Sequence, residues 1–180
     1  MVAEIPKVQA THIEIVDDGL HALDKKKAAT LNEVKRSYGI RYAVHAPFAG
    51  VNIALPTRSL LNATLKRLKE SIINASALDC EMWVFHSGMM TGISMFYPGT
   101  DWVRNLEGVR LLVKFAEDHG LKASIENGMT PFVLKDVEEF KRFYSEVDGD
   151  VGLTFDAGHA NLVGQVESFL MEFPERIVHV

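Results

Sequence analysis

The segment KASIENG, residues 122–128, shows most clearly the pattern that decides the fold. Ser124, Ile125 and Glu126 are small, large apolar and acidic in turn, and successive side chains of a strand point to opposite faces. Three other segments end in the same way, and the four endings are Ala43-Val44-His45, Val84-Phe85-His86, Ser124-Ile125-Glu126 and Thr154-Phe155-Asp156. The pattern predicts strands whose large apolar residues face surrounding helices, while the smaller residues and the polar ends face a common interior.

Strands and helices are expected to alternate along the chain. The predicted strands cover residues 12–16, 41–45, 82–86, 122–126, 151–156 and 176–180. Helices are indicated by apolar residues at 3.6-residue spacing over about 26–38, 57–78, 100–120, 135–147 and 163–173, with Thr100 as an N-cap and Gly120 as a C′ residue. This alternation predicts an α/β fold with parallel strands, and its repeat is close to the roughly 30 residues per unit of a (β/α)8 TIM barrel. An open doubly wound sheet is the alternative, but it predicts an early Gly-rich phosphate loop that the sequence lacks.

Composition and charge narrow the class of protein. The 180 residues are 47% hydrophobic and 24% charged, which predicts one globular domain over residues 1–180. The net charge of −5 and the lack of a Lys/Arg stripe disfavour a nucleic-acid partner but leave it open. Cys80 is the single cysteine, and its apolar neighbours predict a buried thiol in a reducing cytoplasm. Because no apolar run approaches the ~20 residues that a membrane span needs, a soluble cytoplasmic protein is expected.

The four polar strand ends are the candidate functional residues. Parallel strands bring His45, His86, Glu126 and Asp156 to the carboxyl-terminal face, where barrel enzymes keep their active sites. Two imidazoles and two carboxylates are costly to bury unpaired, and a divalent cation would resolve that cost. Mixed nitrogen and oxygen ligands suit zinc, manganese or iron better than calcium. The turn Ala157-Gly158 brings His159 to the same rim.

Each candidate also has a structural interpretation. A strand-end carboxylate can serve as a hydrogen-bonded structural group, and a histidine can be neutral and bonded to the backbone. His159 can cap the following helix, and Glu14 can form a structural salt bridge instead of lying at the barrel mouth. His179 is interpreted as structural. The apolar loop after His86 is either a substrate lid or a segment packed on the barrel, and its large residues are Met89, Met90, Met95, Phe96 and Tyr97.

Five motifs of the sequence resemble those of a known family. They are Ile13-Glu14-Ile15; Val44-His45-Ala46-Pro47-Phe48 followed by Asn52-Ile53-Ala54; Val84-Phe85-His86-Ser87-Gly88; Ile125-Glu126-Asn127-Gly128; and Phe155-Asp156-Ala157-Gly158-His159. In order and spacing they resemble the second to sixth strands of the xylose isomerase-like TIM-barrel superfamily, which includes sugar-phosphate isomerases and epimerases and endonuclease IV (AP endonuclease family 2). Ser87 stands where the family has proline.

The resemblance implies a role for each residue. Glu126 and Asp156 would hold a central metal. In the endonuclease IV branch, His45 and His86 would join Glu126 around a second metal, and His159 would serve a third. In the isomerase branch Glu126 is also the catalytic acid/base, and His45, His86, Asn127 and Glu14 are candidate substrate contacts. The expected cofactor is Mn or Zn, with Mg or Co as alternatives.

The resemblance also implies that the barrel is incomplete. The chain matches strands two to six and the start of strand seven, with residues 2–10 as the tail of a first helix. The next family ligand, a histidine of strand seven, and a glutamate of strand eight fall outside it. Open sheet edges favour association, so a homo-oligomer is expected.

Three functions follow as hypotheses. The first is a metal-dependent isomerase or epimerase that acts on a small sugar or sugar phosphate through an enediolate. The second is an endonuclease IV-type zinc phosphodiesterase acting on abasic DNA, which the acidic charge disfavours. The third is an inactive fragment that a partner completes.

Overall fold

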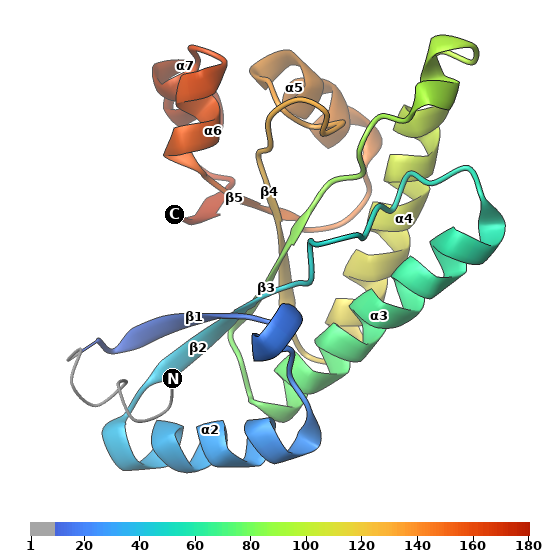
Figure 1. Ribbon diagram of the computed structural model, residues 1–180. Coiled ribbons are helices and arrows are strands. Elements are labelled where there is room, and N and C mark those ends of the chain that lie inside the picture. The colour runs from blue at the N-terminus through green and yellow to red at the C-terminus, as the bar shows by residue number, and fades with distance from the viewer. Residues whose placement is uncertain (1–9) are drawn as a thin grey trace.

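The structure, a computed structural model, describes residues 10–180 and consists of one curved parallel sheet with helices packed against it (Figure 1). The strands are β1 His12–Val16, β2 Arg41–His45, β3 Met82–His86, β4 Lys122–Glu126, β5 Gly152–Thr154 and β6 Ile177–His179. Their order in the sheet is their order in the chain, and every neighbouring pair is parallel. Each crossover therefore leads to the adjacent strand, as in a barrel, and the doubly wound alternative is wrong. The sheet is an incomplete (β/α) barrel of six strands.

The helices connect these strands. They are α2 Lys25–Tyr38, α3 Arg58–Ala77, α4 Thr100–Glu117, α5 Val137–Glu146, α6 Ala157–Leu162 and α7 Val166–Glu172, with 3-10 turns η1 Gly19–His21 and η2 Gly92–Met95. The long helices α3 and α4 lie side by side along the same face of the sheet (Figure 1). The tail of a first helix was expected over residues 2–10, of which residues 2–9 lie outside the described part of the chain. Ala10 is in neither a helix nor a strand.

Four strands have the predicted bounds, and the differences are at the ends of other elements. The fifth and sixth strands are shorter than the predicted 151–156 and 176–180. Gly99, with a φ of 85°, is the N-cap of α4 in place of Thr100, and Gly120 comes two residues after the C-cap Asp118 instead of at C′. The helix predicted over 163–173 is the shorter α7, and a further short helix that was not predicted, α6, precedes it with Asp156 as its N-cap. A side-chain cap starts α6 and the positive φ of Gly99 starts α4, and hydrophobic periodicity detects neither signal.

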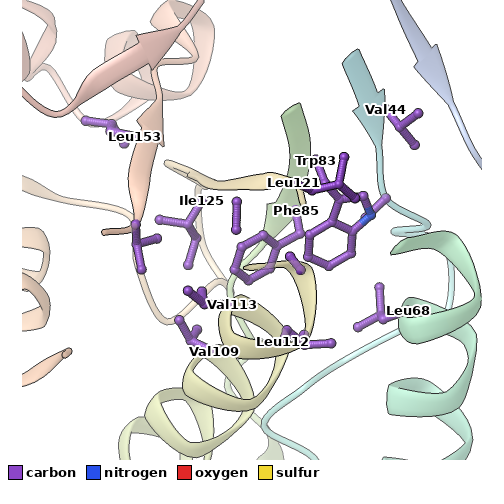
Figure 2. Close-up of a cluster of buried hydrophobic side chains, with 14 of the residues drawn as sticks. Val44, Leu68, Trp83, Phe85, Val109, Leu112, Val113, Leu121, Ile125 and Leu153 are labelled. Atoms are coloured by element: carbon purple, nitrogen blue, oxygen red, sulfur yellow. The ribbon is translucent and has the colours of Figure 1, made fainter. Parts of the chain in front are cut away.

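The core lies between the sheet and the helices. Figure 2 shows Val44, Phe85 and Ile125 among the side chains packed toward Leu68 of α3 and Val109, Leu112 and Val113 of α4. All of these residues are buried, as is Phe155 on the fifth strand segment. The other face of the strands carries the smaller set, and the hydroxyls of Ser124 and Thr154 are bonded there at 2.7 Å. The predicted division between a helix-facing and an interior face is confirmed.

Two further expectations concern single features. Cys80 is buried, and burial raises the pKa of its thiol to about 12, so the thiol stays protonated at neutral pH. Over residues 10–180, every helix is either too short or too polar to cross a bilayer.

Candidate metal centre

Strand register places the polar strand ends on one rim. His86 is the register partner of Glu126, and Glu126 is the partner of Thr154, two residues before Asp156. His45 ends the neighbouring β2. Because the strands are parallel and curve toward one another, the last side chain on each interior face points to the same opening.

Glu126 lies between three imidazoles. Its Oε2 is 3.1 Å from Nε2 of His45 and 3.6 Å from Nε2 of His86, and its Oε1 is 3.5 Å from Nδ1 of His159. Its side chain is only 9% exposed. A carboxylate so buried requires compensation by cations or hydrogen bonds, and the three imidazoles are the ionisable groups that the structure places against it.

These side chains form two groups that offer ligand atoms to a cation. His45, His86 and Glu126 make the first, which we call the histidine group. Glu126, Asp156 and His159 make the second, which we call the carboxylate group. Within each group the ligand atoms lie within 4.8 Å of one another, and Glu126 belongs to both. Imidazole nitrogen and carboxylate oxygen are ligands suited to zinc or manganese, so the donor set fits the expected divalent metal.

The two histidines of the first group differ in their hydrogen bonds. Burial lowers the pKa of His45, but its bonds to Glu126 and to the Ala46 carbonyl outweigh burial and raise it overall. Burial lowers the pKa of His86 to about 4. Nδ1 of His86 is buried without a hydrogen-bond partner among the described residues. His86 is therefore neutral near pH 7, the form in which an imidazole binds a metal.

Asn127 organises the carboxylate group from behind. Its Oδ1 accepts from the backbone N–H of Asp156 at 2.7 Å, and its Nδ2 donates to the Asp156 carbonyl at 2.9 Å. Nδ1 of His159 lies 2.9 Å from the Asn127 carbonyl oxygen, and Oδ1 of Asp156 accepts from the His159 N–H at 2.7 Å. Bonding through Nδ1 leaves Nε2 of His159 available to a metal or substrate. Asn127 is fully buried, so it supports the site from within, and its role as a substrate contact stays a prediction.

Glu14 belongs to neither group. Its Oε2 is 2.8 Å from Nε2 of His179, so the pair links β1 with β6, which are not neighbours in the sheet. This is the salt-bridged arrangement that the sequence left open for Glu14, and it agrees with a structural role for His179. The negative charge of Glu14 also contributes, as the smallest cause named, to the raised pKa of His45. A substrate contact by Glu14 stays a prediction.

Two aromatic residues that sequence reasoning did not assign enclose the histidine group. Phe132 stacks on His86 with ring centroids 4.9 Å apart and an interplanar angle of 22°. Phe48 meets His45 and His86 edge-on, at 5.5 and 6.1 Å. Phe48 follows His45 by three residues, which is a local signal. Phe132 lies 46 residues after His86, and no periodicity connects the two.

Two buried asparagines fix the turn after His86. The N–H of Gly88 donates to Oδ1 of Asn105 at 2.7 Å, and the N–H of Met89 donates to Oδ1 of Asn52 at 2.9 Å. A Cβ on Gly88 would lie 2.5 Å from the Cβ of Ala54, so only glycine fits there. The close packing of this turn on the preceding loop holds His86 at the rim.

The apolar loop beyond this turn is not packed on the barrel. Met95, Phe96 and Tyr97 are between 64% and 83% exposed. The carboxylate of buried Asp101 braces the loop through the backbone and hydroxyl of Thr91. The packed-loop interpretation is wrong for these three side chains, and a role as a lid stays a prediction.

Comparison with known proteins agrees with this architecture. Residues 3–180 match the family described as Xylose isomerase-like TIM barrel. The chain belongs to this family, which confirms the resemblance and the fold class predicted from the sequence. An uncharacterized protein of Methanocaldococcus jannaschii, MJ1311, is 30% identical over 93% of this chain, and the chain spans 59% of that protein's length.

Solved structures with the same fold include a sugar epimerase and a sugar epimerase-like protein. A D-tagatose 3-epimerase-like protein superposes with a TM-score of 0.92 at 28% identity, over 99% of this chain and 69% of its own. D-psicose 3-epimerase in the presence of D-fructose superposes with a TM-score of 0.74 at 21% identity, over 91% of this chain and 59% of its own. The second likeness, at this identity, shows the fold alone.

Proposed function

We propose that the protein acts as a divalent-metal-dependent isomerase or epimerase on a small sugar or sugar phosphate. The observation that carries the proposal is the buried carboxylate of Glu126, which is shared by two groups of side chains that could hold a metal at the mouth of a barrel. The likeness to a D-tagatose 3-epimerase-like protein over nearly the whole chain supports the substrate class.

Glu126 is the base in this proposal. It removes a proton from the carbon next to the sugar carbonyl, and the electron pair left behind passes to the carbonyl oxygen to give an enediolate. An isomerase returns the proton to the former carbonyl carbon while the adjacent hydroxyl proton passes to the former carbonyl oxygen. An epimerase instead returns a proton from a second acid to the opposite face of the same carbon. The bound metal supplies stabilisation of the negative charge that develops on oxygen.

The other residues of the site would hold the metal and orient the substrate. Asp156, His159, His45 and His86 would hold the metal with Glu126, and the available Nε2 of His159 can instead orient a substrate hydroxyl. Asn127 keeps Asp156 in place through two backbone hydrogen bonds. The rings of Phe48 and Phe132 exclude water from one side of the imidazoles, which strengthens electrostatic interactions there.

The histidine group favours a second candidate, a zinc phosphodiesterase of the endonuclease IV type. Two candidate metal sites that share one carboxylate ligand would suit an in-line displacement at phosphorus. The net charge of −5 opposes binding to a polyanionic DNA backbone. We therefore keep it as the alternative.

One experiment separates the two. The full-length natural protein is loaded with manganese or zinc and given D-tagatose or D-fructose in deuterated water, and separately a DNA duplex with one abasic site. We expect solvent deuterium at the carbon next to the carbonyl, and its loss in Glu126→Gln but not in Glu70→Gln, an exposed glutamate on α3. Incision of the abasic site without deuterium entering either sugar would overturn the proposal.

A further inference from the structure

Asp18, just after β1, binds the loop that follows β2. Its Oδ2 accepts hydrogen bonds from the backbone N–H groups of Phe48 at 3.0 Å and Ala49 at 2.8 Å. Its Oδ1 accepts from the N–H of Gly19 at 2.7 Å. Burial raises the pKa of Asp18, but the three backbone bonds outweigh burial and lower it, so the carboxylate is ionised at neutral pH. Charge-assisted bonds of this kind are stronger than those between neutral groups.

Asp17, the preceding residue, anchors the loop that carries Asp18. Asp17 is fully buried, and its Oδ1 accepts from Nη2 of Arg67 on α3 at 2.8 Å and from the N–H of Leu23 at 2.6 Å. The N–H of Asp17 donates to the carbonyl of His45 at 2.9 Å. The loop that carries Asp18 is thus fixed to the helix layer and to the end of β2, independently of Phe48.

Phe48 is the side chain that this arrangement places. It is 48% exposed although it lies beside two site histidines, with ring centroids 5.5 Å from His45 and 6.1 Å from His86. A small hollow at this point is lined by Phe48, Phe132 and His86, among others. An aromatic ring left half exposed at the edge of a site keeps apolar area available for a ligand.

We propose that Asp18 is a positioning residue that holds Phe48 as an aromatic wall beside His45 and His86, against which the carbon-bound hydrogens of a sugar substrate pack. The substrate contact rests on the proposed function, whereas the positioning does not. The negative face of an aromatic ring attracts the weakly positive C–H groups on one side of a sugar, so the wall selects for a carbohydrate presented on that side.

A purely structural role makes a different prediction. If Asp18 only stabilises its own loop, its loss lowers stability and leaves the histidine environment unchanged. If it acts through Phe48, removing either residue has the same effect on the imidazoles, and removing both adds nothing further. Non-additivity between residues in one chain of contacts is what a double-mutant cycle measures.

The test uses the full-length protein with Asp18→Ala, Asp18→Asn, Phe48→Leu and the double variant Asp18→Ala/Phe48→Leu. Asp24→Ala is the matched control, because Asp24 also accepts a backbone N–H, from Lys27 at 2.8 Å, as the N-cap of α2. The first readout, which needs no substrate, is the NMR shift of the ring protons of His45 and His86, which the ring current of Phe48 perturbs. The second is KM and kcat for manganese-loaded enzyme with D-tagatose.

We expect Phe48→Leu and Asp18→Ala to move the His45 and His86 signals in the same direction, with the double variant matching Phe48→Leu alone. KM should rise about five- to tenfold in Phe48→Leu and less in Asp18→Ala, with kcat changed less than KM. Asp18→Asn should lie between wild type and Asp18→Ala, since it keeps one accepting oxygen but loses the charge and the other. It decides the matter where Asp18→Ala does not fold. Asp24→Ala should resemble wild type in both readouts.

Unmoved histidine signals in folded Asp18 variants would overturn the positioning, as would effects of the two single substitutions that simply add in the double variant. Moved signals with an unchanged KM in Phe48→Leu would overturn the substrate contact. A wild-type protein without sugar turnover would refute the proposed function and with it the contact, while the histidine signals would still decide the positioning.

Discussion

The histidine group and the carboxylate group share Glu126 but are built in different ways. In the histidine group, His86 lies in apolar surroundings: it is stacked on Phe132, and its Nδ1 has no hydrogen-bond partner within residues 10–180. The carboxylate group is hydrogen-bonded and more open, with the Asp156 side chain 36% exposed and capping α6. Apolar packing orients His86 in the first group, whereas backbone hydrogen bonds orient His45 and the ligands of the second group.

This difference suits different tasks. A neutral imidazole in an apolar pocket offers a lone pair without competition from water, which favours tight metal binding. A partly exposed carboxylate beside an available imidazole leaves room for a substrate oxygen. We therefore expect the histidine group to retain a metal and the carboxylate group to meet the substrate.

The largest expected effect comes from the residue that both groups share. Glu126→Gln removes the proposed base and weakens both metal groups, so turnover should fall by about 1,000-fold or more. Bound manganese or zinc, measured by elemental analysis after desalting, should fall as well. Glu70→Gln is the control. Full metal content in Glu126→Gln would show that Glu126 is not the common ligand.

Removal of one histidine tests whether the two groups are separable. His86→Ala takes one of three ligands from the histidine group and none from the carboxylate group, so zinc affinity should fall by about 100-fold at one site only. His159→Ala should do the converse. Calorimetric zinc titration of both variants gives stoichiometry and affinity. Identical titrations would mean that the two groups act as one site.

Asp156 combines a ligand with a helix cap, and two substitutions separate these roles. Asp156→Ala should lower the free energy of unfolding by about 1 kcal/mol, because α6 loses the hydrogen bond that the His159 N–H donates to Oδ1 of Asp156. Asp156→Asn keeps a good N-cap and should cost little stability, while losing the anionic ligand. Urea unfolding of the metal-free proteins measures the difference. Equal losses of stability would assign no capping role to Asp156.

The smallest effect, and the most direct, is the contrast between His45 and His86 in the metal-free protein. The pKa of His45 is raised, so this imidazole should keep its proton above the usual pH of about 6.5. The pKa of His86 is lowered to about 4, so this imidazole should stay neutral until the pH falls near that value. An NMR pH titration of the ring protons measures both pKa values. Coincident titrations would contradict the difference between the imidazole of His86, which is packed among apolar groups, and the hydrogen-bonded imidazole of His45.

Part of this site follows from local sequence. Alternation in the segments ending at His45, His86 and Glu126 predicts both the strand bounds and the interior face, because a strand's side-chain direction depends only on neighbouring residues. Parallel order then requires these ends to meet on one rim. The order and spacing of the motifs also indicate the family, because they are read directly from the sequence.

Other parts were decided only by the tertiary structure. No local pattern predicts that Phe132 stacks on His86, that Asn105 holds the turn at Gly88, or that Asp18 binds the backbone of Phe48. Each contact joins segments at least 17 residues apart, and its geometry depends on loop paths that side-chain caps and buried hydrogen bonds select. The sequence determined which groups reach the barrel mouth. Only the tertiary structure decided which of them lie in apolar surroundings, which are hydrogen-bonded and which stay exposed to solvent, because burial is a property of the whole packed chain.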